Sequence, residues 1–275
     1  MALLDENYEN TTTVIGVQNN NQPEPNWIAT GFFVGVKDKN GPGSYVYLVT
    51  NKHVIMDVIN QHYQSMKIRV HLKTGTIQPI DVTLIQGNKN RYLCSPSKEV
   101  DVAVIALNGR VFESVLDKVA FFDLDDNALL AKDYLNEGGF EGSPVFMLGF
   151  PMGSRLVDEY STTPICRKGC IARFKSDEIK NKKSFLLDLQ NFPGNSGSPI
   201  ISCPEIAGLI GTKTLKRAML IGIVYGYLPY EENLFNLQTK QIVEVRKENS
   251  GIAIANPVDC IKDLIEADLK NKGIQ

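Results

Sequence analysis

Short stretches in which hydrophobic and polar residues alternate run along most of the chain, and glycine, proline and asparagine separate them. Alternation with a period of two predicts strands with one buried face, and a continuous β-branched run such as 102–107 predicts a fully buried strand. Six such stretches lie in the first half of the chain: 12–17, 28–36, 45–50, 67–71, 78–85 and 102–107. Six more lie in the second half: 144–149, 169–174, 184–189, 198–202, 218–225 and 251–255.

Two segments have helical spacing instead. The stretch 53–65 carries apolar residues at Val54, Ile55, Val58 and Ile59, which predicts a short helix. Pro257 opens a segment whose apolar residues recur every three or four positions up to Leu269. This pattern predicts an amphipathic C-terminal helix packed on the body of the protein.

Composition narrows the function classes. The chain has 275 residues, enough for one or two domains with a large core and no disulfide support. Basic and acidic residues number 29 and 31, are interspersed, and give a formal net charge of −2. We therefore expect neither nucleic acid nor a membrane surface as a partner.

The candidate chemistry centres on the segment 193–199, which reads Pro-Gly-Asn-Ser-Gly-Ser-Pro. A serine between two glycines on a tight turn, here Ser196, can expose a nucleophilic hydroxyl beside backbone amides. His53 directly follows the predicted strand 45–50 and its short polar link, and Asp101 opens the run 102–107. The chain order His, Asp, Ser is that of the chymotrypsin arrangement.

These residue types suit acyl transfer. A serine hydroxyl is a weak nucleophile at neutral pH, and an imidazole, with a pKa of about 6.5, is a suitable general base for it. We therefore expect His53 to act as general base and acid, and Asp101 to orient its ring. The backbone amides of Gly194 and Ser196 would donate to the oxyanion of a tetrahedral intermediate.

Four further motifs accompany these residues: Thr-Gly-Phe-Phe-Val at 30–34, Leu-Gly-Phe-Pro at 148–151, the strand-like stretch 220–226, and Gly-Ile-Ala-Ile-Ala-Asn-Pro at 251–257. With them the chain resembles chymotrypsin-fold (trypsin-like) serine peptidases of the bacterial type over about 28–267. It is similar both to the glutamyl endopeptidases and to the protease domain of the HtrA proteases. Asn195 agrees with the bacterial families, because the zymogen-activated digestive enzymes carry an aspartate there.

The resemblance implies an all-β fold of two Greek-key six-stranded barrels, with the active site between them and a C-terminal helix. The N-terminal barrel would span 12–118 and carry His53 and Asp101. The C-terminal barrel would span 119–256 and carry Ser196, and the helix would span 257–271.

The resemblance also suggests a primary specificity pocket. Counting back six residues from the nucleophile places Gln190 near its base, followed by Asn191, and Tyr225 and Gly226 would form its other wall. No acidic residue stands there for a substrate Lys or Arg, and the stretch 222–226 lacks the histidine of the glutamyl endopeptidases. We expect a small or medium uncharged side chain at the cleavage position, called P1, and a substrate backbone paired as an added strand.

No metal site or cofactor is expected. The three histidines are nine residues apart, which suits neither helix nor strand periodicity, and no ligand pattern accompanies them. Cys166 and Cys170 could form a redox pair or half of a zinc site, but no second ligand pair is in view. The five cysteines are an odd number and do not match the disulfide framework of the digestive enzymes.

The first residues are acidic where a secretory signal would be basic and then apolar, and no apolar run reaches the ~18 residues of a membrane span. This favours a cytoplasmic protein with reduced cysteines, although a secreted protein that has lost its signal would look the same. The partner would be a protein or peptide substrate, and the sequence leaves the oligomeric state open.

Two alternatives to a constitutively active serine endopeptidase stay open. One is a latent or inactive protease-fold module that binds peptides and becomes active only when a partner reshapes it. The other is an esterase or acyltransferase that uses the same three residues.

Overall fold

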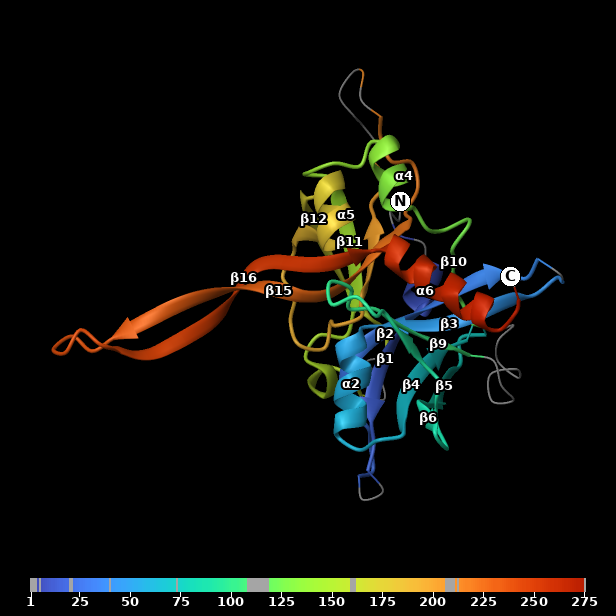
Figure 1. The fold of residues 1–275 in the computed structure, drawn as a ribbon, viewed down its shortest axis with the longest axis horizontal. Coiled ribbons are helices and arrows are strands. Elements are labelled where there is room, and N and C mark those ends of the chain that lie inside the picture. Colours follow the sequence, from blue (N-terminus) through green and yellow to red (C-terminus); the bar gives the residue numbers. More distant parts are fainter. Residues whose placement is uncertain are drawn as a thin grey trace.

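The computed structural model describes residues 4, 6–19, 22–39, 41–72, 74–107, 119–158, 162–205, 211 and 213–274. Strands dominate, and they form two halves with a helix from the C-terminus beside them (Figure 1). The predicted fold class is confirmed. The end of the predicted N-terminal barrel, 108–118, lies outside the described residues.

The N-terminal half is an eight-stranded sheet. Seven strands follow one another in the order β5-β4-β1-β2-β3-β9-β8, and β10 pairs in parallel with β2. In β4, Met66, Ile68 and Val70 are buried while Lys67 and Arg69 are not, as alternation predicts. The strands are β1 (Thr12–Val17), β2 (Asn26–Lys37), β3 (Ser44–Thr50), β4 (Ser65–His71), β5 (Ile77–Thr83), β8 (Leu93–Cys94), β9 (Ala103–Ala106) and β10 (Phe122–Asp123); β6 (Ile85–Gln86) and β7 (Lys89–Asn90) pair separately.

The C-terminal half is a closed barrel with the strand order β11-β12-β13-β16-β15-β14. Its interior contains three aromatic rings, those of Tyr134, Phe174 and Phe185, with successive centroids 4.9 Å apart. The strands are β11 (Pro144–Gly149), β12 (Ile165–Arg173), β13 (Phe185–Asp188), β14 (Pro199–Ser202), β15 (Leu220–Phe235) and β16 (Ile242–Pro257).

A hydrophobic cluster joins the two halves. Phe32 and Tyr47 of the N-terminal sheet belong to it together with Leu148 and Ile201 of the barrel. The C-terminal helix α6 (Val258–Asn271) contributes the residues spaced three and four apart that its sequence pattern predicted: Val258, Ile261, Leu264, Ile265 and Leu269. Burial of this shared apolar surface holds the halves against each other.

The remaining helices are short. The helix predicted within 53–65 is α2 (Lys52–Asn60); it ends before His62, whose φ of 65° is left-handed. Its buried face carries Val54, Ile55 and Val58, which belong to the predicted apolar set. The others are α1 (Glu6–Asn10), α4 (Ala131–Asn136), α5 (Ser176–Lys182) and the 3₁₀ turn η2 (Gly153–Arg155). None of the described helices is long and apolar enough to cross a membrane.

Strands β15 and β16 extend far beyond the segments 218–225 and 251–255 that the sequence predicted. Each is 16 residues long, and past the barrel they form a two-stranded hairpin that projects away from the body (Figure 1). We call residues 227–249 the arm. Between 227 and 248 every residue is exposed except Leu234, which is half-buried.

Candidate active site

His53 and Asp101 lie side by side because their elements pair. His53 is in the first turn of α2, which starts just after β3, and Asp101 lies two residues before β9. Thr50 at the end of β3 is paired with Ala103 at the start of β9. The His53 ring Nδ1 lies 2.5 Å from Asp101 Oδ2, and the His53 backbone N–H donates to Asp101 Oδ1 at 2.9 Å. Both carboxylate oxygens therefore hold the histidine.

The loop that carries Asp101 is anchored from both halves. The side-chain amide of Asn51 donates to the Asp101 carbonyl at 2.8 Å. Asn256 of β16, which is fully buried, accepts from the Asp101 N–H through Oδ1 at 2.9 Å. The Nδ2 of Asn256 also donates to the carbonyls of Glu99 and Lys183. The C-terminal barrel thus fixes the backbone of a residue in the N-terminal half.

These contacts change the basicity of the histidine. Burial lowers the pKa of His53, but the hydrogen bond and the negative charge of Asp101, with a smaller contribution from Asp57, outweigh it. The net result is a pKa raised above the ordinary value of 6.5. Such an imidazole is a stronger base than a free one.

Ser196 lies at the junction of two tight turns. Asn195 N–H donates to the Phe192 carbonyl at 3.0 Å, and Ser198 N–H donates to the Asn195 carbonyl at 2.9 Å. The third residue of each turn is a glycine with positive φ, 96° at Gly194 and 88° at Gly197. This is the signature of type II turns, which disfavour any residue with a Cβ at the third position. The consecutive turns lift Ser196 out of the strand direction.

Thr30 of β2 ties these turns to the N-terminal half. Its N–H donates to the Ser196 carbonyl at 2.9 Å, and its hydroxyl donates to the Gly194 carbonyl at 2.7 Å. The same hydroxyl accepts from Phe150 N–H at 3.0 Å. Its own carbonyl accepts from the hydroxyl of Thr50, three residues before His53. Thr30 is fully buried and connects the serine turn to the histidine segment.

The amides of Gly194 and Ser196 are available for a ligand. Within the hydrogen bonds of the described residues, neither amide is a donor. Ser196 is half-buried, and within the same residues no hydrogen bond joins its Oγ to the His53 ring. Such contacts are often long in free enzymes and shorten when substrate binds. The site therefore offers a hydroxyl, a base and two unpaired donors.

The predicted pocket residues occupy different environments. Gln190 is exposed, whereas Asn191 is only 4% exposed. The Asn191 side chain donates from Nδ2 to the Gly226 carbonyl at 3.0 Å. The backbone carbonyl of Asn191 accepts from Asn249 Nδ2 at 2.6 Å. Tyr225 is half-buried, and burial raises its pKa. Asn191 and Gly226 are thus brought into direct contact.

Three residues that the sequence left without a role belong to this site. Thr30 was noticed only within a strand motif, and Asn256 only within the motif before the C-terminal helix. Asn249 lies in the arm, which the sequence did not predict. The bonds of Thr30 to Gly194, of Asn256 to Asp101 and of Asn249 to Asn191 join residues 164, 155 and 58 positions apart, so no local pattern could have singled them out.

Other groups lack a comparable arrangement. In the part of the chain that the structure describes, no three His, Cys, Asp or Glu side chains are placed to hold a metal ion. All five cysteines are free thiols, and burial raises the pKa of Cys94 to about 11 and that of Cys260 to about 12. The Cys94 and Cys260 thiols are therefore protonated near neutral pH.

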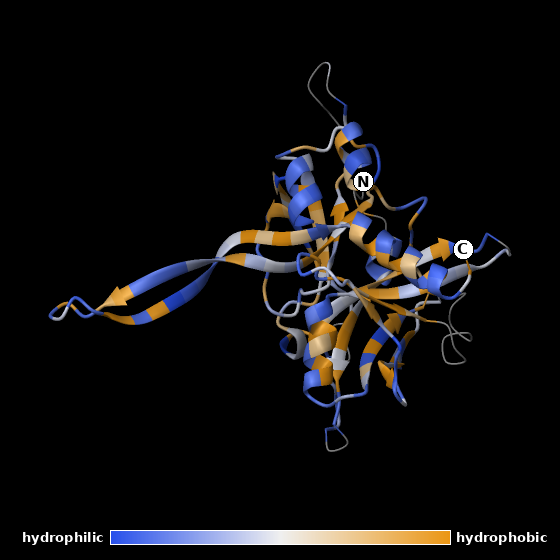
Figure 2. Ribbon diagram, in the orientation of Figure 1, coloured by the Kyte–Doolittle hydropathy of each residue, from blue (hydrophilic) through white to orange (hydrophobic). Residues whose placement is uncertain are grey.

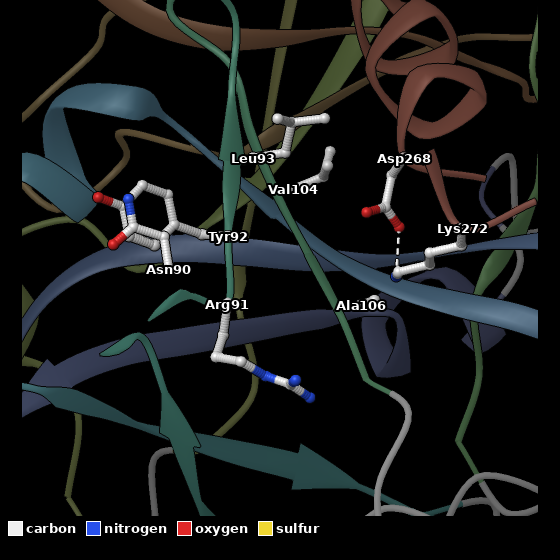
Figure 3. Close-up of a pocket in the computed structure, with 8 residues that line it drawn as sticks. All are labelled: Asn90, Arg91, Tyr92, Leu93, Val104, Ala106, Asp268 and Lys272. Atoms are coloured by element: carbon white, nitrogen blue, oxygen red, sulfur yellow. Dashed lines mark hydrogen bonds and ion pairs between the residues drawn. The ribbon is translucent and has the colours of Figure 1, made fainter. Parts of the chain in front are cut away.

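Two cavities differ in their position relative to the site. One of 320 Å³ lies against α6, where Asp268 and Lys272 pair with each other and Arg91 points away (Figure 3). It contains none of the candidate residues. The other, of 410 Å³, is lined by Trp27, Met152 and Gly194 among others, and so adjoins the serine turn.

The fold is shared with known proteases. The chain is similar to the crystal structure of the serine endoprotease from Yersinia pestis, with 16% identity and a TM-score of 0.50 over 97% of this chain and 65% of that one. It is also similar to the crystal structure of Deg5, with 16% identity and a TM-score of 0.53 over 94% of this chain and 88% of that one. No curated protein is matched by sequence.

The sequence itself assigns the chain to a family. The model of the trypsin-like peptidase domain matches residues 29–206, which include His53, Asp101 and Ser196. The chain therefore belongs to the trypsin-like peptidase family. The resemblance inferred from the motifs is confirmed for the family, which is one of peptidases, the expected enzyme class. The similar solved structures confirm the fold.

The raised pKa of His53 sets an expected pH dependence. The reaction needs the neutral imidazole, so kcat/KM should fall as the pH drops through the His53 pKa, with a midpoint above 6.5. The profile of peptide hydrolysis or of fluorophosphonate labelling measures it. Asp101→Asn should move the midpoint down, because the negative charge that raises the pKa is lost. A midpoint at or below 6.5 in the unaltered chain would contradict the described contact.

Thr30→Val tests the link between the halves. Valine keeps the shape of threonine but leaves the Gly194 carbonyl and the Phe150 amide without their partner, so the oxyanion donors lose their support. We expect kcat to fall by about 10- to 100-fold. Thr30→Ser, which keeps the hydroxyl, should retain most of the activity. Equal losses in Thr30→Ser and Thr30→Val, with unchanged unfolding temperatures, would contradict this role of the hydroxyl, because serine keeps it.

Proposed function

We propose that this chain is a serine endopeptidase in which Ser196 is the nucleophile, His53 the general base and acid, and Asp101 the residue that orients His53. The observation that carries the proposal is a pair of connections: Asp101 is hydrogen-bonded to His53, and Thr50, three residues before His53, is hydrogen-bonded to Thr30, which in turn bonds to the turn of Ser196. It joins both halves of the protein at one place.

The residues divide the reaction into two acyl transfers. Ser196 Oγ attacks the carbonyl carbon of the scissile bond while His53 Nε2 takes its proton, and the oxyanion accepts from the amides of Gly194 and Ser196. When the intermediate collapses, the C–N bond breaks and His53 returns the proton to the leaving amine. Water then repeats the sequence on the acyl-enzyme, and Asp101 stabilises the imidazolium both times.

The free edge of β15 supports recognition of an extended peptide. One edge of β15 pairs with β16, whereas its other edge pairs with β14 only up to Ile223. Val224, the next residue, bonds to Gly197 and Ser198, and Tyr225 and Gly226 follow it, so a substrate strand could continue the sheet there. The cavity beside Gly194 would accommodate the residues after the scissile bond.

The contact of Asn191 with Gly226 supports a small P1 side chain. The two residues stand on the two segments that the family resemblance assigns to opposite walls of the primary pocket. The Asn191 amide reaches from one wall to the other and is held at its backbone by Asn249. Space between the walls is then limited, and the lack of an acidic residue agrees with an uncharged P1 group.

Covalent labelling tests the nucleophile. Ser196→Ala should lower turnover by about 10⁶-fold, since both the attacking group and the acyl-enzyme are lost. A fluorophosphonate should add to Ser196 in the unaltered chain, as read by peptide mass mapping, and His53→Ala should abolish the addition. Substantial turnover in Ser196→Ala would refute the assignment. A folded chain that is not labelled would favour the latent peptide-binding module, and turnover of small esters without peptides would favour the esterase.

A single substitution tests the pocket. Asn191→Ala removes the amide that contacts Gly226 and so enlarges the pocket. The kcat/KM for peptides with Leu or Phe at P1, relative to that for peptides with Ala at P1, should therefore rise about tenfold. Gln190→Ala is the matched control, because Gln190 is the neighbouring residue and is exposed. A change in preference in the control but not in Asn191→Ala would show that the limiting residue was wrongly chosen.

A further inference from the structure

The arm is exposed on all sides. Its apolar side chains include Tyr230, Phe235 and Leu237, which are 59%, 55% and 83% exposed. Hydrophilic residues lie along its middle and hydrophobic ones nearer its tip (Figure 2). An isolated two-stranded hairpin has marginal stability in water, and a third or fourth strand stabilises it. The arm therefore has the features of a segment that acquires more strands.

Both outer edges of the arm are open. Among the described residues, β13 pairs with β16 only at Ile252–Ala255, so the edge from 242 to 249 has no partner strand. The two edges differ in charge. The β15 part of the arm contains Glu231 and Glu232, no basic residue, and Pro229, which lacks an N–H. The β16 part reads Ile-Val-Glu-Val-Arg-Lys-Glu from 242 to 248 and contains both signs.

We propose that two copies of this chain associate through the β16 edges of their arms, antiparallel, about a two-fold axis at Val245. In this register Glu244 of each copy stands opposite Arg246 of the other, which gives two cross-strand pairs of opposite charge. Val245 of each copy stands opposite Val245 of the other. Glu244 and Arg246 already share one face, since Arg246 Nε lies 3.0 Å from Glu244 Oε1.

Neighbouring registers are worse. A two-fold antiparallel pair requires one residue to face itself. With Glu244 or Arg246 at the axis, like charges meet directly. The β15 edge of the arm cannot form any pair of opposite charge with itself, because its only charged residues, Glu231 and Glu232, are both acidic. The two Val245 side chains, 50% exposed, would meet at the axis on the opposite face from the proposed charge pairs, and Val243, 64% exposed, would stand opposite Lys247 of the second copy on that face.

The resulting sheet has the order β15, β16, β16 of the second copy and β15 of the second copy. Because the central strands are antiparallel, the two bodies lie at opposite ends of the sheet. A contact along one short edge is small for a stable complex, so the dimer should dissociate on dilution.

A charge swap tests the register. Sedimentation velocity over a concentration series should show a monomer–dimer equilibrium for the unaltered chain. Glu244→Arg or Arg246→Glu alone replaces two attractive pairs with two repulsive ones, and each should raise the dissociation constant by about tenfold or more. The double variant Glu244→Arg/Arg246→Glu restores opposite charges and should restore the dimer. Asn233→Lys, which adds a charge on β15 of the same arm, is the matched control and should dimerise normally.

Several outcomes would overturn the proposal. These are a monomer at every concentration, a dimer insensitive to both single variants, and a double variant no better than the singles. Species larger than a dimer would indicate pairing of β15 with β16 of the next copy instead. An arm that binds an added peptide while the chain stays monomeric would indicate another partner. Self-association is measured without substrate, so its failure leaves the proposed peptidase function untouched.

Discussion

The hydrogen bonds of Thr30 are the constraint on which the site depends. A peptidase of this family needs a nucleophile from one half and a base from the other, so something must hold the two halves in register. Thr30 does this with its N–H, its carbonyl and its hydroxyl, all within a buried environment where an unpaired polar group is costly. The hydrophobic cluster between the halves supplies adhesion, but only directional bonds set the position of Ser196 relative to His53.

Asn256 completes the connection from the opposite end of the chain. It is fully buried in β16 and holds the backbone of Asp101, which in turn holds the ring of His53. The last barrel strand therefore contributes to the geometry of a candidate site whose proposed base and orienting carboxylate lie in the first half. This also explains why the C-terminal segment packs against both halves rather than forming a separate unit.

Strands β15 and β16 combine two tasks in one pair of segments. Near the barrel they carry Tyr225 and Gly226 beside the serine turn, and further out they form the exposed arm. Asn249, at the base of the arm, is bonded to Asn191 in the predicted pocket. The predicted pocket and the arm thus share a covalent and hydrogen-bonded framework.

The sequence by itself determined the family, most strands, α6 and the three catalytic candidates, because alternation of side chains, helical spacing and the turn glycines are local properties. It did not reveal α5, whose charged residues bury no apolar face, or the arm, whose mixed exposed residues resemble a loop. Only the tertiary structure decided the roles of Thr30, Asn256 and Asn249, as well as the contact across the predicted pocket. Those roles depend on hydrogen bonds between residues far apart in the chain, and such pairings arise only when the two halves pack together.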